Sequence, residues 1–321
     1  ASRWPARAVS QRDDALARGI AFLARRQDAS GRWWDYPDAA VGASTEWVTA
    51  FVGASLARVP DPLAQRCARA AWRWLRARVR PSGGWGWSAL FPADADSTAW
   101  GLLLAARLGI DDARVRRARR FLDAHATAGG VATFRARGPL SWLRHALDAR
   151  TFAGWARPHA CVTALAATLP RPPPGALDAL RAMQRPEGEW RAYWWPDDEY
   201  ATALAVEALA RAGDAAAAET GARWLAARLG AERSASASAW ALLGLAAAGE
   251  ARPEAAGRLA RAAQDDGGWP ASSWMRVVHP DEADPPREGW QRGLGAPGGV
   301  IVDERRLLTS AAAVAALAVA K

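Results

Sequence analysis

The sequence predicts an all-α protein, a single closed (α/α)6 barrel (toroid) of six helical-hairpin repeats over residues 1–321. Three observations predict this fold. Ala, Leu and Arg dominate the chain, and these residues favour helix. Six apolar segments each carry a small-residue pair, Thr-Ala or Ser-Ala, and each follows an arginine-rich amphipathic segment. Because one such hairpin cannot bury its own apolar face, six in series are expected to close on themselves.

The apolar segments are the predicted inner helices of the barrel. They have almost no polar face, so each should be buried on both sides. Their small residues allow close approach of neighbouring helices. In chain order they span residues 46–56, 96–108, 161–169, 200–213, 236–249 and 309–320.

The amphipathic segments are the predicted outer helices, and they carry most of the charge. The net charge is +9, and the excess is arginine because Lys321 is the only lysine. These arginines are spread over outer faces such as residues 114–120 rather than gathered in one patch. We therefore expect a solvated surface and no nucleic-acid partner. Peripheral contact with an anionic membrane, or attraction to a diphosphate, stays open.

The turns between outer and inner helices repeat a Gln-Gly-Trp pattern. Residues 27–33 and 184–190 both read Q-x-x-x-G-x-W, residues 264–269 are a copy shorter by one residue, and Gly83-Gly-Trp85 keeps the end of the pattern. The Gln can bind a helix end, the Gly permits a left-handed turn and the Trp stacks on it. The motifs resemble the QW repeats of squalene–hopene and oxidosqualene cyclases, that is, of class II terpene cyclases and their prenyltransferase relatives. We interpret them as structural staples.

The first residues of all inner helices should meet at one mouth of the barrel, and the second repeat differs from the others there. It reads Asp94-Ala-Asp96-Ser97-Thr98-Ala99, which resembles the D-x-D-D-T-A motif of class II terpene cyclases. In that family the middle Asp protonates an alkene or epoxide. The resemblance implies that Asp96 is the acid and Asp94 its activating neighbour. Ser97 stands where squalene–hopene cyclases hold a third Asp, a position at which other members carry a small hydrogen-bonding group.

An acid of this kind must stay protonated near neutral pH. The charge of Asp94 and a dry cavity would hold the proton on Asp96, and His159, which opens the next inner helix, is its candidate partner. The alternatives are structural: Asp94 and Asp96 as ordinary helix N-caps, and His159 as a satisfied polar residue at a helix start. Glu46 is either a capping-box member, which we favour, or a second acid facing the cavity.

Nineteen tryptophans stand against three tyrosines, and indole faces stabilise cations without offering a nucleophile. Those on outer helices are expected to serve packing only. The predicted substrate-binding residues are those near the mouth: Glu46, Trp47, Ser97, Trp100, Trp34, Trp87, Trp155, Trp195, Tyr200 and Trp240.

Two long segments, residues 128–158 and 267–308, are candidate lids over the mouth. No cofactor is expected: Cys161 and His159 lack the third ligand of a prenyltransferase zinc site, and Mg²⁺ would be needed only for a diphosphate substrate. The start of the chain shows no secretory signal pattern, and two distant cysteines do not suggest a disulfide, which together indicate the cytoplasm. The apolar run at residues 310–320 is too short to span a membrane.

The leading hypothesis is a class II-like cyclase that protonates an alkene or epoxide of a small isoprenoid or terpenoid-hybrid substrate and cyclises it through carbocations. One alternative is a cyclase of the same fold acting on a non-terpene polyene or polyketide. Another is a non-catalytic barrel that binds a hydrophobic ligand or a protein partner. Squalene–hopene cyclases have two such barrels and this chain has one, so the substrate stays open. A cavity with Asp96 in its wall and indoles around it would favour the enzyme, and a filled centre would favour the scaffold.

Overall fold

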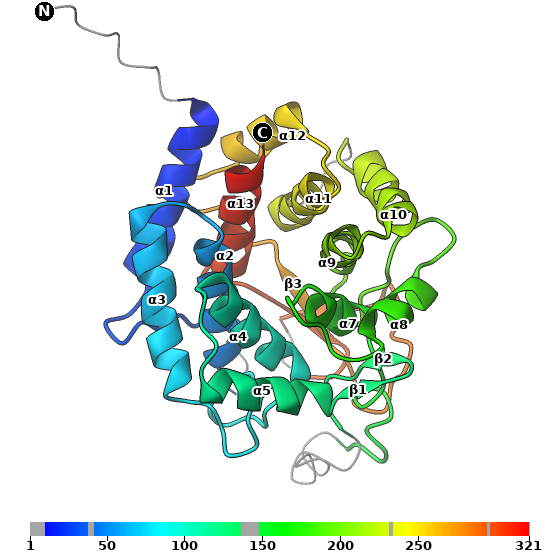
Figure 1. The fold of residues 1–321 in the computed structure, drawn as a ribbon. Helices are drawn as coiled ribbons and strands as arrows, with labels where there is room; N and C mark the ends of the chain where they lie inside the picture. The colour runs from blue at the N-terminus through cyan, green and yellow to red at the C-terminus, as the bar shows by residue number, and fades with distance from the viewer. Residues whose placement is uncertain (1–9, 38–41, 136–147, 231–233, 294–295, 321) are drawn as a thin grey trace, which may run out of the picture.

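The computed structural model describes residues 10–37, 42–135, 148–230, 234–293 and 296–320. The helices in these ranges alternate between an outer and an inner ring (Figure 1). The outer ring consists of α1 (Gln11–Arg26), α3 (Pro62–Arg76), α5 (Ala113–Asp123), α8 (Ala176–Met183), α10 (Ala215–Arg228) and α12 (Pro253–Arg261). The inner ring consists of α2 (Glu46–Ala57), α4 (Ala95–Arg107), α7 (Ala160–Ala167), α9 (Glu199–Arg211), α11 (Ala235–Ala247) and α13 (Leu307–Val319).

The inner ring is closed. Each inner helix packs on the next, in the order α2, α4, α7, α9, α11 and α13, and α13 packs back on α2. Every residue of α7 is buried, whereas α5 on the outside buries only Val115, Ala118 and Leu122. This division confirms the predicted (α/α)6 barrel.

The tryptophans of the turns join the two helices of each hairpin. In four repeats the indole N–H donates to a carbonyl of the outer helix at 2.6–2.9 Å. The backbone N–H of the same residue donates to the hydroxyl of the small-residue pair at 3.0–3.1 Å. The pairs are Trp33 with Thr49, Trp85 with Thr98, Trp190 with Thr202 and Trp269 with Ser310. The pair therefore begins with Thr or Ser because its hydroxyl accepts a buried N–H, a role beyond close packing.

The glutamine and glycine of the motif join neighbouring hairpins. The Gln27 side-chain amide donates to the carbonyl of Gly31 at 2.8 Å and to that of Cys67, in α3, at 3.0 Å. Gly31 has φ +96°, and a Cβ there would lie 2.5 Å from the carbonyl oxygen of Ala70. Only glycine fits such a left-handed position at that distance. These contacts show how the Gln and Gly of the motif connect one hairpin to the next.

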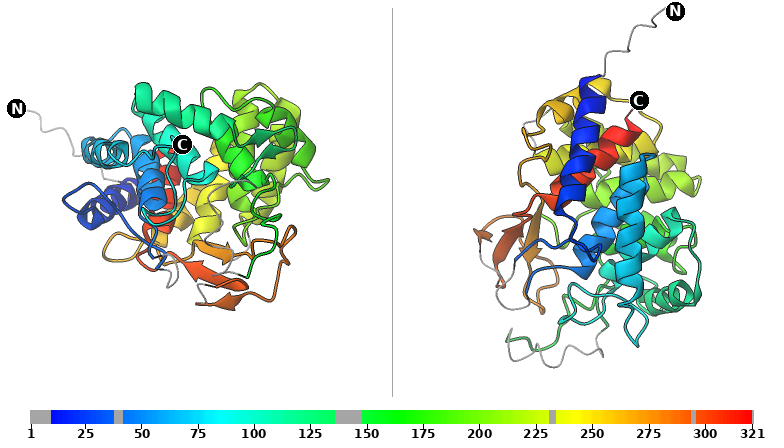
Figure 2. Two further views of the ribbon diagram at one scale, coloured as in Figure 1. Left: turned by 90° about the horizontal axis from the view of Figure 1, so that it is seen from below. Right: turned by 90° about the vertical axis from the view of Figure 1, so that its left-hand side faces the viewer.

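The segment 267–308 contains strands, which the sequence did not indicate. Strand β3 (Trp274–Val277) pairs antiparallel with β5 (Gly299–Val302), and β4 (Gln291–Arg292) pairs parallel with β5. This small sheet lies at one end of the barrel (Figure 2). A second ladder, of β1 (Ala126–Thr127) and β2 (Gly130–Val131), precedes α7.

The two long segments contact one another. The Asp281 carboxylate accepts the backbone N–H groups of Arg150, Thr151 and Phe152 at 2.7–2.8 Å. The Trp155 indole donates to the carbonyl of Val278 at 2.9 Å. The part of segment 128–158 from residue 136 to 147 lies outside the described residues. In the ranges that the structure describes, no helix is both long enough and apolar enough to cross a bilayer.

Candidate active site

A cavity of about 130 Å³ lies against the small sheet, because residues of β3 and β5 line it. Both long segments contribute to its wall, as do α2, α4 and the loops before α4 and α9. Its wall is mostly apolar, with a few polar groups. The lining residues are Trp47, Trp87, Phe91, Asp94, Asp96, Ser97, Thr133, Phe134, Trp155, Trp194, Trp195, Met275, Arg276, Val277, Pro297 and Ile301.

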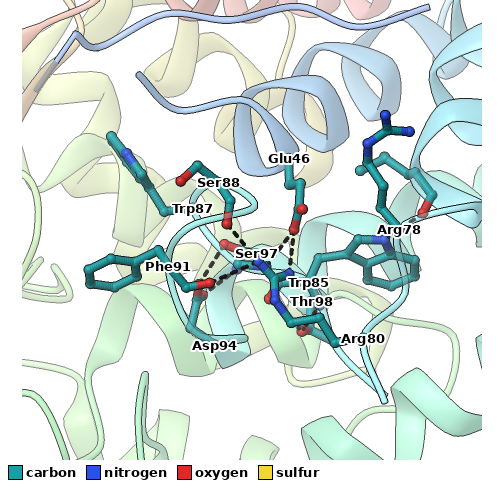
Figure 3. Close-up of polar contacts among 12 residues, drawn as sticks. Glu46, Arg78, Arg80, Trp85, Trp87, Ser88, Phe91, Asp94, Ser97 and Thr98 are labelled. Carbon is teal, nitrogen blue, oxygen red and sulfur yellow. Dashed lines mark hydrogen bonds and ion pairs between the residues drawn. The ribbon is translucent and has the colours of Figure 1, made fainter. Parts of the chain in front are cut away.

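Asp94 is the N-cap of α4. Its carboxylate accepts the backbone N–H of Ser97 at 2.7 Å and the Ser97 hydroxyl at 2.7 Å (Figure 3). Burial raises the pKa of Asp94 to about 7, and the two bonds from Ser97 act against that rise. The cap interpretation is therefore correct for Asp94. Ser97 has a defined role in place of a third Asp, because its hydroxyl binds the capping carboxylate.

Asp96 lies in the first turn of α4 and faces the cavity. Asp94 caps the helix, so the Asp96 carboxyl group does not serve as the cap. It accepts a hydrogen bond from the Trp47 indole N–H, which lies 2.8 Å from Oδ2. Burial among apolar groups raises the pKa of Asp96 to about 8, the charge of Asp94 adds to the rise, and the Trp47 hydrogen bond opposes it. Asp96 is therefore protonated at neutral pH. This arrangement can deliver a proton into an apolar cavity.

His159 does not bind Asp96, and the predicted pairing is wrong in that respect because both ring nitrogens are engaged elsewhere. Nδ1 lies 3.0 Å from the Thr133 hydroxyl, and Nε2 lies 2.9 Å from the carbonyl of Gly154. Since a carbonyl only accepts, Nε2 carries the proton and the Thr133 hydroxyl donates to Nδ1. Burial lowers the pKa of His159 to about 3, so the ring is neutral. His159 does not line the cavity itself, but it contacts Thr133, which does.

Glu46 does not face the cavity, and neither its interpretation as a cap nor that as a second acid is correct. Its carboxylate forms an ion pair with Arg80 and accepts the backbone N–H of Gly86 at 3.0 Å (Figure 3). Arg80 also donates to the carbonyls of Ser88 and Phe91, at 2.6 and 2.8 Å. The pair thus holds the loop that brings Trp87 and Phe91 to the cavity.

Four of the predicted tryptophans line the cavity: Trp47, Trp87, Trp155 and Trp195. The Trp47 ring stacks on Trp87, with centroids 5.5 Å apart, and on Trp195, at 5.8 Å. The wall beside Asp96 is therefore built of packed indole rings, and Trp47 meets Asp96 through its N–H edge. In the described part of the chain, three other predicted binding residues are not in the cavity wall but lie deeper in the barrel: Trp100, Tyr200 and Trp240.

Trp34 is also displaced from its predicted place. It is 39% exposed, with the Arg305 guanidinium 3.9 Å over its ring. The cause is local: Trp33 turns inward to form its staple, so the next side chain points outward. Trp34 lies in a surface groove with the exposed Leu90.

Several wall residues were not predicted. Thr133 lies just after the β1–β2 ladder, and Met275 and Arg276 lie in β3. The Arg276 side chain is buried and donates to the carbonyl of Ala192 at 3.0 Å. Segments without helical periodicity carried no signal that would have selected these positions. Within the described ranges, no group of three or more His, Cys, Asp or Glu side chains could hold a metal ion.

No protein family model and no curated protein matches the chain. Among solved structures, a protein from Actinoplanes matches with a TM-score of 0.90 and 36% identity, covering 96% of this chain and 99% of that one. The type II terpene cyclase MstE from Scytonema matches with a TM-score of 0.87 and 32% identity, covering 97% and 98%. A variant of MstE in complex with its substrate, geranylgeranyl dihydroxybenzoate, matches with a TM-score of 0.87 and 31% identity over 96% of each chain.

Proposed function

The chain belongs to the type II terpene cyclases, and on that premise we propose that Asp96 is the acid that starts its cyclisation reaction. Enzymes of this class protonate an alkene or epoxide and cyclise the resulting cation. The observation that carries the proposal is the position of Asp96, a carboxylic acid protonated at neutral pH in the wall of an indole-lined cavity. Asp94 acts by raising the pKa of Asp96.

The proton moves from Asp96 to a carbon of the terminal double bond of the prenyl chain, and a carbocation forms at the other, more substituted carbon of that bond. The next double bond attacks that cation, which forms a ring and moves the charge onward until a C–H bond next to the cation gives its proton to a solvent water. Solvent returns a proton to the Asp96 carboxylate before the next turnover. The carboxylate left on Asp96 accepts the Trp47 N–H and lies in the first turn of α4, where the helix dipole favours negative charge. The indoles stabilise the moving cation by about 0.5–2 kcal/mol per contact.

The proposed substrate class is a prenylated aromatic acid or phenol, a terpenoid hybrid. MstE binds a compound of this kind, and the apolar wall of the cavity suits a prenyl chain. The two long segments, which both contribute to the wall, act as lids that keep water from the cation. His159 is a positioning residue, because it orients the Thr133 hydroxyl at the wall.

Cyclisation in heavy water tests the proposed function. The enzyme is incubated in D₂O with prenylated hydroxybenzoates, and the product is analysed by mass spectrometry and NMR. Because Asp96 exchanges with solvent and another proton is lost from carbon, we expect a cyclic isomer with one deuterium on a former alkene carbon. A product without carbon-bound deuterium, or no cyclic product across the series, would contradict the proposal.

The activity should depend on pH through Asp96. A carboxylic acid donates only in its protonated form, so the rate should fall as the pH rises through about 8. Trp47→Phe removes the hydrogen bond that lowers this pKa, so the fall should move to higher pH. The rate at the optimum should also decrease, because the departing carboxylate loses a donor. The profile of kcat against pH for both proteins checks this, and an unmoved alkaline limb would refute the assignment.

A further inference from the structure

A second layer of aromatic rings lies beneath the cavity. It consists of Phe51 from α2, Trp100 from α4, Tyr200 from α9 and Trp240 from α11. We call this layer the aromatic floor. Its members are buried, and in the described part of the chain they do not belong to the cavity wall. Four of the six inner helices therefore each place a ring in the barrel centre.

The rings of the floor form one continuous layer. Phe51 meets Trp100 edge to face, with centroids 4.6 Å apart, and Tyr200 meets Trp240 in the same way at 4.7 Å. The Trp100 indole donates to the Tyr200 hydroxyl at 3.2 Å, and Phe51 lies 6.0 Å from Trp240. Contacts therefore run between rings of all four helices, and the four rings lie together in the barrel centre.

The floor is coupled to the cavity wall above it. Trp195 in the wall stacks on Tyr200 at 4.7 Å, and Trp47 in the wall lies 6.1 Å from Phe51. A substrate that contacts the indoles of the wall is thus one ring layer from the floor.

A cluster of charged side chains lies at the opposite end of the barrel. There the Glu207 carboxylate accepts both hydrogen bonds of Arg58 at 2.8 Å, and Arg211 binds it at 2.8 Å. The Arg107 guanidinium lies 3.8 Å from the same carboxylate. These groups come from the carboxyl-terminal ends of α2, α4 and α9. On the side of the cavity away from the mouth, a longer chain therefore meets the floor first.

We propose that the aromatic floor sets the longest prenyl chain that the enzyme accepts, with Trp240 as the determining residue. The proposal rests on the proposed function, because it assigns the limit on substrate length to the same cavity. Trp240 is chosen because Trp100 also carries the hydrogen bond to Tyr200, so its loss would disturb more than volume. Truncation of a buried indole leaves a cavity on the order of 100 Å³ that neighbours fill only in part, about the space of one isoprene unit.

The first experiment compares the wild type with Trp240→Ala on hydroxybenzoates that carry geranyl, farnesyl, geranylgeranyl or geranylfarnesyl chains. The measured quantity is kcat/KM for the chain one isoprene unit longer than the wild-type optimum, divided by kcat/KM at that optimum. We expect this ratio to rise at least about tenfold in the variant, equivalent to 1.4 kcal/mol. A ratio within about twofold of the wild-type value would overturn the proposal.

The second experiment measures binding of the same series with saturated chains, which no acid can cyclise, by quenching of tryptophan fluorescence. If Trp240 limits length, Trp240→Ala gains affinity for the longer chain even if cyclisation is absent, so failure of the floor and failure of the proposed function are distinguishable. Trp224→Ala is the matched control, because Trp224 lies on the outer helix α10 with the Arg228 guanidinium 4.4 Å over its ring. The Trp224→Ala variant should prefer the same prenyl chain length as the wild type. Phe51→Ala, which opens the same layer, serves if Trp240→Ala does not fold.

Discussion

Asp96→Asn is expected to lower kcat about a thousandfold, the range that a general acid contributes. Asparagine has the shape of aspartic acid, and its side-chain oxygen can still accept the Trp47 N–H that Asp96 Oδ2 accepts at 2.8 Å. It has no proton acidic enough to transfer to an alkene. The variant should therefore fold and bind substrate with an unchanged KM. Rates measured by chromatography of the cyclic product, with a thermal melt of each protein, check this expectation.

Asp94→Asn is the matched control for this variant. Asparagine is as good an N-cap as aspartate, so α4 should keep its start and the protein its stability. The charge that helps to raise the pKa of Asp96 is lost, and the rate should fall less, by about tenfold. His159→Gln should also lower the rate less than Asp96→Asn does, because His159 contacts Thr133 and not Asp96. An Asp96→Asn enzyme within tenfold of the wild type would show that another group donates the proton.

The fold was predictable because it repeats. Six apolar helices that each open with a hydroxyl-bearing pair reveal a barrel even when the turn motif is degraded. The third repeat shows why: it lacks the tryptophan, yet the backbone N–H of Val131 donates to Thr163 at 2.9 Å, as Trp33 does to Thr49. The hydroxyl position persists because any buried N–H there needs an acceptor.

The candidate site was predictable at the starts of the inner helices and, for Trp87, Trp155 and Trp195, in the segments that lead to the mouth. Three site residues lie at the starts of inner helices, and the alignment of repeats predicts their positions: Asp94, Asp96 and Trp47. Trp34 and Glu46 were misplaced, because the direction of a side chain in a loop or at a helix start depends on contacts with residues distant in sequence. Arg80, which lies 34 residues from Glu46, has no pattern that would pair the two.

The ion pair of Glu46 with Arg80 leads to a prediction on stability. Glu46 is 2% exposed and Arg80 18%, so Glu46→Ala removes one partner of a largely buried pair and leaves the charged guanidinium without a counter-ion. Breaking such a pair costs about 3 kcal/mol, and the backbone N–H of Gly86 loses its acceptor as well. Urea unfolding measures the loss.

The same change should reach the active site, because Arg80 also holds the carbonyls of Ser88 and Phe91. With this loop released, Trp87 and Phe91 are no longer fixed at the cavity wall, so KM should rise while the pH at which activity falls stays near that of the wild type. Asp14→Ala is the control, since its ion pair with Arg18 is exposed and contributes less than about 1 kcal/mol. Equal losses of stability in the two variants would mean that the buried pair does not hold the loop, and Glu46 would then have to act at the site in another way.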